Sequence, residues 1–199
     1  MKIALVLTVL LLQTTLWIPR AGAQARVSIT VDAGHDGYYS TQVPTPIRVR
    51  LANEGESFRA RVELTAPAQG GSILYFTEID LPQNSEKLLT LYPHYASFAP
   101  NAQVRVLNDK QVVARSEDKL TQVDGSARLF GLLASDTAPY AGLSSREQGA
   151  ESVIARLTTE TLSERADAMG ALDTLVVDGV DTGALSDAQR AALDGWVQL

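Results

Sequence analysis

The spacing of apolar residues changes near residue 124, and this change most strongly constrains the fold. Upstream, apolar and polar residues alternate, as where Ile47, Val49 and Leu51 are interleaved with arginines. Downstream, nearly continuous apolar runs occupy 128–134 and 172–177. Alternation predicts strands with one face packed and one face in water, whereas continuous runs predict strands buried on both faces of a parallel sheet. The sequence therefore predicts two units of different class.

Residues 26–122 are predicted to form an antiparallel β-sandwich. Turn residues separate about seven short strands, at 27–31, 47–51, 58–64, 73–79, 87–92, 103–107 and 112–115. We expect 73–79 to pair with 87–92 across the turn at 81–84, and 103–107 to pair with 112–115. Seven short strands with regular turns indicate an immunoglobulin-like sandwich. The cysteine pair and core tryptophan of antibody domains are absent, so only the architecture is predicted.

Residues 127–199 are predicted to be an incomplete α/β parallel-sheet domain. Its first strand is 128–134, and 153–157 suits a strand or a helix. A short helix over 163–170, with a serine cap and a final glycine, leads to a central strand at 172–177. Ser186 and Gln189 form a capping-box pattern that starts a last helix. The predicted apolar face of that helix consists of Ala188, Ala192, Leu193, Trp196, Val197 and Leu199.

The chain reaches Leu199 with no glycine to end this helix and no following strand. We therefore expect it to be the front part of a longer protein.

The first 23 residues have the pattern of a secretory signal peptide. Lys2 precedes an apolar run over 3–12, and Ala21-Gly22-Ala23 offers a small-x-small cleavage site. A membrane anchor is the alternative, but polar residues at 13–15 interrupt a run shorter than the roughly 20 residues that span a bilayer. We expect export to the periplasm or cell surface, with the mature chain starting at Gln24 or Ala25.

Charge and cysteine content exclude several classes of protein. The net charge of −6 becomes −8 once Lys2 and Arg20 are removed with the signal peptide. This balance argues against nucleic-acid binding and gives no attraction to anionic lipid. With no cysteine, the chain has neither disulfides nor thiol catalysis. No second hydrophobic segment follows, so any permanent membrane anchor is expected beyond residue 199.

Two stretches resemble parts of large bacterial exported envelope proteins. DAGHDGYYSTQVPTPIRVRLANEG, residues 32–55, is similar to the start of their sandwich domain. LDTLVVDGVDTGALSDAQRAALDGWVQL, residues 172–199, is similar to the opening of their class I glutamine-amidotransferase-like domain, with its Leu-Ser-x-x-Gln…Ala-Leu…Trp-Val pattern. The resemblance implies a membrane-anchored protein whose later sequence completes a flavodoxin-like domain. The cysteine and histidine of true amidotransferases come later than Leu199, so no catalytic residue is transferred.

Polar residues follow two of the predicted parallel strands. Ser135 and Asp136 come after the first strand, and Asp178 and Asp181 after the central one. Open α/β sheets bind ligands at the carboxyl ends of their strands, so these four residues are candidates for a ligand edge. The three carboxylates would suit a hard cation. The alternative, which we favour, is that they cap loops or lie in solvent.

Other patterns give weaker candidates, and we expect no metal or cofactor. Asp32, Gly34, Asp36 and Gly37 suggest a calcium loop but lack the EF-hand spacing, so a glycine-rich turn is favoured. The only histidines, His35 and His94, are too isolated to form a zinc site and are predicted to be surface or turn residues.

An aromatic platform for a sugar or a partner is a further candidate. Its members would be Tyr38, Tyr39, Tyr92, Tyr95 and Phe98. Packing at the end of the sandwich is the favoured alternative, because tyrosine and phenylalanine are common core residues there.

Three functions are compatible with these features. The favoured one is a non-catalytic component of the cell envelope, whose sandwich is a spacer or binds other envelope proteins. The second is an amidotransferase-like or hydrolytic enzyme with its catalytic residues beyond residue 199. The third is a carbohydrate-binding module that uses the tyrosines. A fold alone does not decide among them.

Overall fold

The computed structural model describes residues 26–68, 70–96, 101–144, 146–147 and 150–199. The predicted signal peptide, 1–23, and Phe98 lie outside these ranges. Within them, no helix is both long and apolar enough to cross a bilayer.

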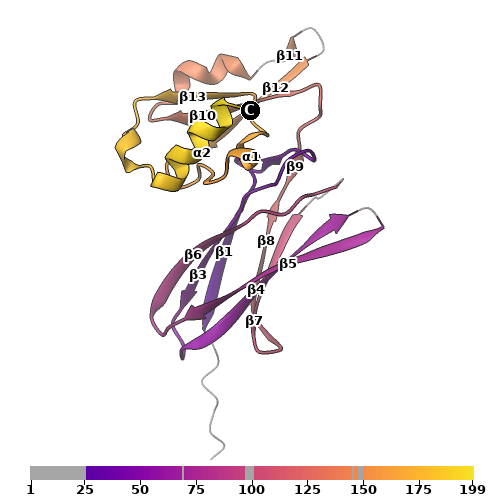
Figure 1. Ribbon diagram of the computed structural model, residues 1–199, viewed down its shortest axis with the longest axis vertical. Helices are drawn as coiled ribbons and strands as arrows, with labels where there is room; N and C mark the ends of the chain where they lie inside the picture. The colour runs from indigo at the N-terminus through magenta and orange to yellow at the C-terminus, as the bar shows by residue number, and fades with distance from the viewer. Residues whose placement is uncertain (1–25, 69, 97–100, 145, 148–149) are drawn as a thin grey trace, which may run out of the picture.

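The sandwich, residues 26–122, contains two antiparallel sheets and a short parallel pair, β2 (Tyr38–Tyr39) with β9 (Thr121–Gln122) (Figure 1). Three strands form one sheet in the order β1 (Val27–Ala33), β3 (Ile47–Asn53) and β6 (Ser85–Leu91). Four form the other, in the order β5 (Gly71–Leu81), β4 (Phe58–Ala68), β7 (Asn101–Asn108) and β8 (Gln111–Lys119). These strands contain the seven predicted segments, and two sheets of three and four strands have the immunoglobulin-like architecture.

The core of the sandwich comes from alternate residues, as the period of two predicts. Ile47, Val49 and Leu51 on β3 are fully buried, as are Ala60, Val62 and Leu64 on β4. The side chains of successive strand residues point to opposite faces, so these positions form the inner layer of each sheet.

The predicted hairpin of 73–79 with 87–92 is wrong. β5 pairs with β4, and β6 pairs with β3, so the turn after Leu81 carries the chain from one sheet to the other. Asn53 holds this crossover, because its Nδ2 donates to the carbonyls of Leu81 (3.1 Å) and Pro82 (3.0 Å). The hairpin of 103–107 with 112–115 is confirmed by the pairing of β7 with β8.

The C-terminal unit, residues 127–199, is organised around a small mixed sheet. Its strand order is β11 (Arg146–Glu147), β12 (Ala150–Leu157), β10 (Arg128–Ala134) and β13 (Thr174–Asp178). β10 pairs in parallel with both β12 and β13, so the two continuous apolar runs do lie parallel in one sheet. The segment 153–157, left open between strand and helix, is a strand.

Helices cover one face of this sheet. Leu129 and Leu133 of β10 and Ala155 of β12 share a core with Met169 and Ala192. Met169 belongs to α1 (Ala166–Met169) and Ala192 to α2 (Asp187–Val197), which lie between the sheet and the sandwich in Figure 1. Two 3₁₀ segments, η1 (Ala138–Leu143) and η2 (Thr182–Ala184), lie in the connecting loops.

Three expectations for this unit need correction. β13 is an edge strand of the sheet rather than a central one, and Val177 is 46% exposed, because only β10 pairs with it. The helix predicted over 163–170 is a single turn, and its N-cap is Arg165, since the Ser163 hydroxyl accepts from the Arg165 amide instead. Gly170 has φ −61, a backbone conformation that any residue can adopt, so it does not end the helix in the left-handed conformation that favours glycine.

The last helix is partly as predicted. Ser186 and Gln189 form both bonds of the capping box. The buried side of α2 includes Ala192 and the partly buried Leu193 and Trp196. Ala188 is exposed, as are Val197 (78%) and Leu199 (87%), so the apolar face is narrower than the sequence suggests.

Candidate functional site

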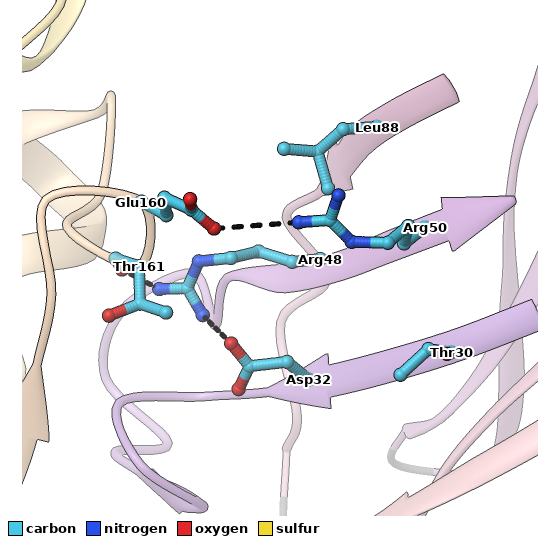
Figure 2. A pocket seen from close by; sticks show the side chains of 7 residues that line it. All are labelled: Thr30, Asp32, Arg48, Arg50, Leu88, Glu160 and Thr161. Carbon is cyan, nitrogen blue, oxygen red and sulfur yellow. Dashed lines mark hydrogen bonds and ion pairs between the residues drawn. The ribbon is translucent and has the colours of Figure 1, made fainter. Parts of the chain in front are cut away.

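The sandwich and the C-terminal unit meet at a small polar cavity (Figure 2). Its volume is about 90 Å³. Five lining residues come from the three-stranded sheet and two from the loop that follows β12: Thr30, Asp32, Arg48, Arg50, Leu88, Glu160 and Thr161.

Arg48 is the centre of this junction. It lies on the outward face of β3 yet is only 6% exposed, because the loop after β12 covers it. One guanidinium nitrogen donates to Asp32 Oδ2 (3.2 Å) and to the Gly34 carbonyl (3.1 Å). The other donates to the carbonyl of Thr161, across the boundary between the units. Of the three bonds, the one to the Gly34 carbonyl is buried and the other two are part-buried, and the one to Thr161 links the two units.

Arg50 makes a second, weaker link. It pairs with Glu86 on β6 and lies 3.5 Å from Glu160 Oε2 of the C-terminal unit. The Arg50 side chain is 49% exposed and that of Glu160 is 76% exposed, so solvent screens this pair.

A tight turn after β1 carries the third contact. His35 donates its amide to the Tyr38 carbonyl (2.8 Å), and the Tyr38 amide donates back to the His35 carbonyl (3.0 Å). Gly34 has φ +72, and a Cβ there would lie 2.3 Å from the Tyr38 carbonyl oxygen. The turn therefore requires glycine at position 34, both for its left-handed conformation and for space.

This turn places His35 inside the junction. His35 is 1% exposed, and its Nε2 lies 3.0 Å from the carbonyl oxygen of Ala168 on α1. A carbonyl only accepts, so Nε2 carries the proton and Nδ1 is bare. Nδ1 is buried with no hydrogen-bond partner among the described atoms. His35 is predicted to be a surface or turn residue; it does lie in a turn, but it is buried rather than at the surface, and His94 is exposed as expected.

Burial lowers the pKa of His35 to about 4, and the nearby Arg48 charge acts in the same direction. Burial also raises the pKa of Asp32, against the attraction of Arg48. At neutral pH the junction thus contains a neutral imidazole beside a buried guanidinium.

Two further contacts complete the junction. The amide of Arg156 on β12 donates to Asp36 Oδ2 (2.9 Å), so the predicted calcium-loop residues Asp32 and Asp36 both serve the interface. The Arg165 guanidinium lies over the ring of Tyr92, 5.0 Å from its centroid. A cation over an aromatic face contributes about 0.5–1 kcal/mol at an exposed site.

The residues that line this cavity make structural contacts between the two units. Its volume, about 90 Å³, has room for only a few water molecules. Asp32, Gly34 and Thr161 accept from three of the five N–H donors of the buried guanidinium, so most of its hydrogen bonding is already used within the protein. The arrangement can fix the angle between the two units.

The candidate ligand-edge residues do lie at the carboxyl ends of β10 and β13; Ser135 and Asp178 link the two loops, whereas Asp136 and Asp181 bond within their own loops. The Ser135 amide donates to the Asp178 carbonyl (3.1 Å), and Asp136 Oδ1 accepts from the Ala138 amide (2.9 Å). Asp181 Oδ1 accepts from the Gly183 amide (2.9 Å). Asp178 Oδ2 accepts from the Tyr140 hydroxyl (2.9 Å), which raises the pKa of Tyr140.

A cavity of about 300 Å³ lies at this edge, where β10 and β12 end. Of the four candidate residues only Asp181 lines it, together with Thr158 and Thr159, which sequence reasoning missed. Across the described ranges, no group of three acidic or histidine side chains is placed to hold a metal ion.

The candidate aromatic residues do not form one platform. Tyr39 and Tyr95 are buried and pack edge to face, with ring centroids 5.5 Å apart. Burial raises the pKa of Tyr95. Tyr38 packs against the core of the C-terminal unit, and Tyr92 lies beneath Arg165.

Arg48 had no sequence signal as a junction residue. The alternation on β3 places both Arg48 and Arg50 on the face predicted to contact solvent. Only the fold shows that Arg48 is buried and Arg50 is exposed. The DAGHDGYY stretch did contain a signal, because two glycines around His35 indicate a constrained turn.

Comparisons with known proteins cover the sandwich. Residues 26–121 match a family model described as a domain of unknown function, DUF8726. No curated protein gives a significant match.

Several solved structures are similar to about half of the chain. The CARDB domain of a Pyrococcus furiosus protein, in complex with di-metal ions, is 12% identical, with a TM-score of 0.40 over 51% of this chain and 96% of that one. An immunoglobulin-like protein from Pseudomonas aeruginosa is 10% identical, with a TM-score of 0.33 over 50% of this chain and 100% of that one. A β-glucosidase from Erythrobacter marinus is 13% identical, with a TM-score of 0.38 over 50% of this chain and 16% of the enzyme. At these scores the likenesses carry no inference about binding or activity.

Proposed function

We propose that this chain is a non-catalytic, exported component of the bacterial cell envelope. In this proposal the sandwich is a spacer and protein-interaction module, fixed at a set angle to a unit that begins a glutamine-amidotransferase-like domain. A membrane anchor and the rest of that domain would follow residue 199, and the partners would be other envelope proteins.

The observation that supports the proposal is the set of buried and part-buried hydrogen bonds between the two units. A flexible linker needs no buried contacts, whereas here Arg48 and His35 both bond to backbone carbonyls of the other unit. Buried hydrogen bonds that span two units hold them in one orientation, which is the property a spacer needs.

A distance measurement tests the rigidity. The chain has no cysteine, so Lys110→Cys at the far hairpin of the sandwich and Asp194→Cys on α2 would be the only labelling sites. Double electron–electron resonance between spin labels should give one narrow distance distribution. Arg48→Gln should broaden it, and Arg50→Gln, a matched change at an exposed arginine, should not. A broad distribution in the parent protein would remove the proposal of a spacer.

Export is tested separately. Expression of the full sequence in a bacterium should give a product in the periplasmic or surface fraction that starts at residue 24 or 25, as read by N-terminal sequencing. An unprocessed cytoplasmic product would contradict this part of the proposal.

A second candidate is the enzyme with catalytic residues beyond residue 199. The observation in its favour is the cavity of about 300 Å³ at the carboxyl edge of the parallel strands. Extending the chain and assaying glutamine hydrolysis would test it: activity lost on substitution of a later cysteine would favour the enzyme.

A further inference from the structure

The outer face of the four-stranded sheet has an uneven distribution of charge and apolar surface. One row across it, set by the strand register, runs from Phe76 on β5 through Glu63 on β4 to Arg105 on β7 and Arg115 on β8. Directly opposed residues of neighbouring strands point to the same face, so these four side chains lie in line.

This row contains two arginines, Arg105 and Arg115, but only one carboxylate, Glu63. Glu63 is almost buried; its Oε2 accepts from Arg105 Nη2 (2.9 Å), and its Oε1 forms an ion pair with Arg61 Nε (2.9 Å) at an angle outside hydrogen-bond range. Arg115 is exposed, opposes Arg105 directly and has no ion-pair partner in the described part of the chain. Like charges directly opposite each other destabilise a sheet, so an anion between them would relieve repulsion.

A hollow is present at the same place. It measures about 300 Å³ and lies over β7 and β8, with Arg105 and Arg115 in its lining. Its one carboxylate, Glu117, accepts from Gln103 Nε2 (3.3 Å), so neither arginine is its partner.

The other end of the row is apolar. Phe76 is 53% exposed and Leu74, on the same face of β5, is 44% exposed. The Arg61 guanidinium lies 3.9 Å from the centroid of the Phe76 ring. Aromatic and arginine side chains are enriched at protein interfaces relative to ordinary surface, and Leu74 adds apolar area beside them.

We propose that this face binds an acidic, extended peptide segment of a partner protein. A carboxylate of the peptide lies between Arg105 and Arg115, and an apolar side chain packs on Leu74 and the edge of Phe76. Strands are about 4.8 Å apart, so the midpoint between Arg105 and Arg115 lies about 12 Å from Phe76, close to the length of four extended residues. Side chains four residues apart in an extended chain point to the same side, so the face selects an acidic residue followed four residues later by an apolar one.

The chemistry favours a peptide over an acidic polysaccharide. Sugars stack on the open face of an aromatic ring, and Arg61 already covers a face of Phe76. The planar guanidinium of Arg115 suits bidentate binding of a single carboxylate. This inference rests on the proposed role of the sandwich as an interaction module and names the surface and the chemistry of the partner.

The probe is a Gly-Ser peptide that contains one glutamate and, four residues on, one leucine, so that both side chains point to the same side of an extended chain. Titrated into the ¹⁵N-labelled full chain and followed by amide chemical shifts, it should shift resonances of β5, β7 and β8 in a saturable way. Replacing its glutamate by glutamine, or its leucine by serine, should weaken binding about fivefold, the usual scale of one exposed contact.

Variants of the chain sharpen the test. Arg115→Gln and Phe76→Ser should each weaken binding about fivefold, whereas Arg59→Gln, which removes an arginine of the same face that is paired with Glu78, should not. The same spectra show whether each variant is folded, and Phe76→Leu serves as a second variant if Phe76→Ser is not.

Four outcomes would overturn the proposal: no shifts at millimolar peptide, equal weakening by Arg59→Gln, tighter binding of a glucuronate oligosaccharide, or a dimer that pairs along β5. A rigid, exported chain that fails to bind the peptide would leave the spacer proposal standing and remove only this one.

Discussion

The sandwich and the C-terminal unit differ in how completely they cover their apolar surfaces. In the sandwich, two sheets face each other, and the inner residues of β3 and β4 are fully buried. In the C-terminal unit, α1 and α2 cover one face of the sheet, while on the other face Leu132 is buried but Phe130, Ile154 and Val176 are only half-buried. The difference teaches that two units of one chain can have regular secondary structure and yet contribute unequally to its stability.

The junction links these unequal partners. Tyr38 of the sandwich packs against the core of the C-terminal unit, and Arg48 and His35 bond to its backbone. We therefore expect the C-terminal unit to draw part of its stability from the sandwich, and the following predictions test that dependence.

Separating the two units should have the largest effect. Residues 26–122 alone should unfold cooperatively on heating, because their two sheets cover each other. Residues 127–199 alone should show no cooperative transition by circular dichroism, because the half-covered face of the sheet and the junction surface would both be exposed. A sigmoidal transition in the second fragment would break the comparison.

Gly34→Ala should lower the free energy of unfolding by about 3–4 kcal/mol, from the positive φ and from a Cβ that collides with backbone. Gly70→Ala is the matched control: Gly70 has φ +82 but nothing within 4 Å of an added Cβ. It should cost only about 1 kcal/mol, measured by urea denaturation. Equal losses in the two variants would show that the turn around His35 has no steric requirement.

Arg48→Met should destabilise the full chain by about 2–3 kcal/mol, because it leaves the carbonyls of Gly34 and Thr161 without their donor. In the sandwich fragment, which lacks Thr161, the loss should be smaller. Arg50→Met, at an exposed pair, should change the stability by less than about 0.5 kcal/mol. The same loss with and without the C-terminal unit would argue against a junction role for Arg48.

Mild acid should destabilise the junction through His35. The pKa is about 4 when folded and 6.5 when free, so the unfolded chain takes up the proton first and stability falls as the pH falls through this window. The loss between pH 6.5 and about pH 4.5 should be about 2 kcal/mol.

His35→Gln keeps a donor for the Ala168 carbonyl but does not titrate, so it should remove this part of the pH dependence. Burial raises the pKa of Asp32, so the titration of Asp32 stabilises the folded chain as the pH falls, opposite to His35. This contribution is present in both the parent and the His35→Gln variant, so it cancels when their pH dependences are compared. An unchanged slope in the variant would locate the effect elsewhere.

Features of the fold that depend on residues close together in the sequence were easier to predict than features that depend on distant residues. The hairpin of β7 and β8 and the capping box of Ser186 with Gln189 depend on neighbouring residues, and both were predicted. The partners of β5 and β6 were mistaken, because a short turn between two strands suits a hairpin as well as a crossover between sheets. β13 was expected to be buried because an apolar run does not reveal whether a second strand pairs with it.

The candidate sites were less predictable than the fold. Asp136 and Asp181 cap loops as aspartates commonly do, but whether Thr158 joins Asp181 at one cavity depends on how β10 and β12 lie together. The burial of His35 could not be predicted, because nothing near it in sequence indicates that α1, more than a hundred residues later, covers it.

By itself, the amino-acid sequence determined the period of each strand, the turn residues and the helix cap, since these depend on side-chain size and polarity within a few residues. Tertiary structure alone decided which sheet each strand joins and that Arg48 and His35 are buried between the units. Those outcomes depend on surfaces that are distant along the chain, such as the turn at Gly34 and the backbone of Thr161 and Ala168. Whether a polar side chain faces water or another carbonyl is settled only when those surfaces meet.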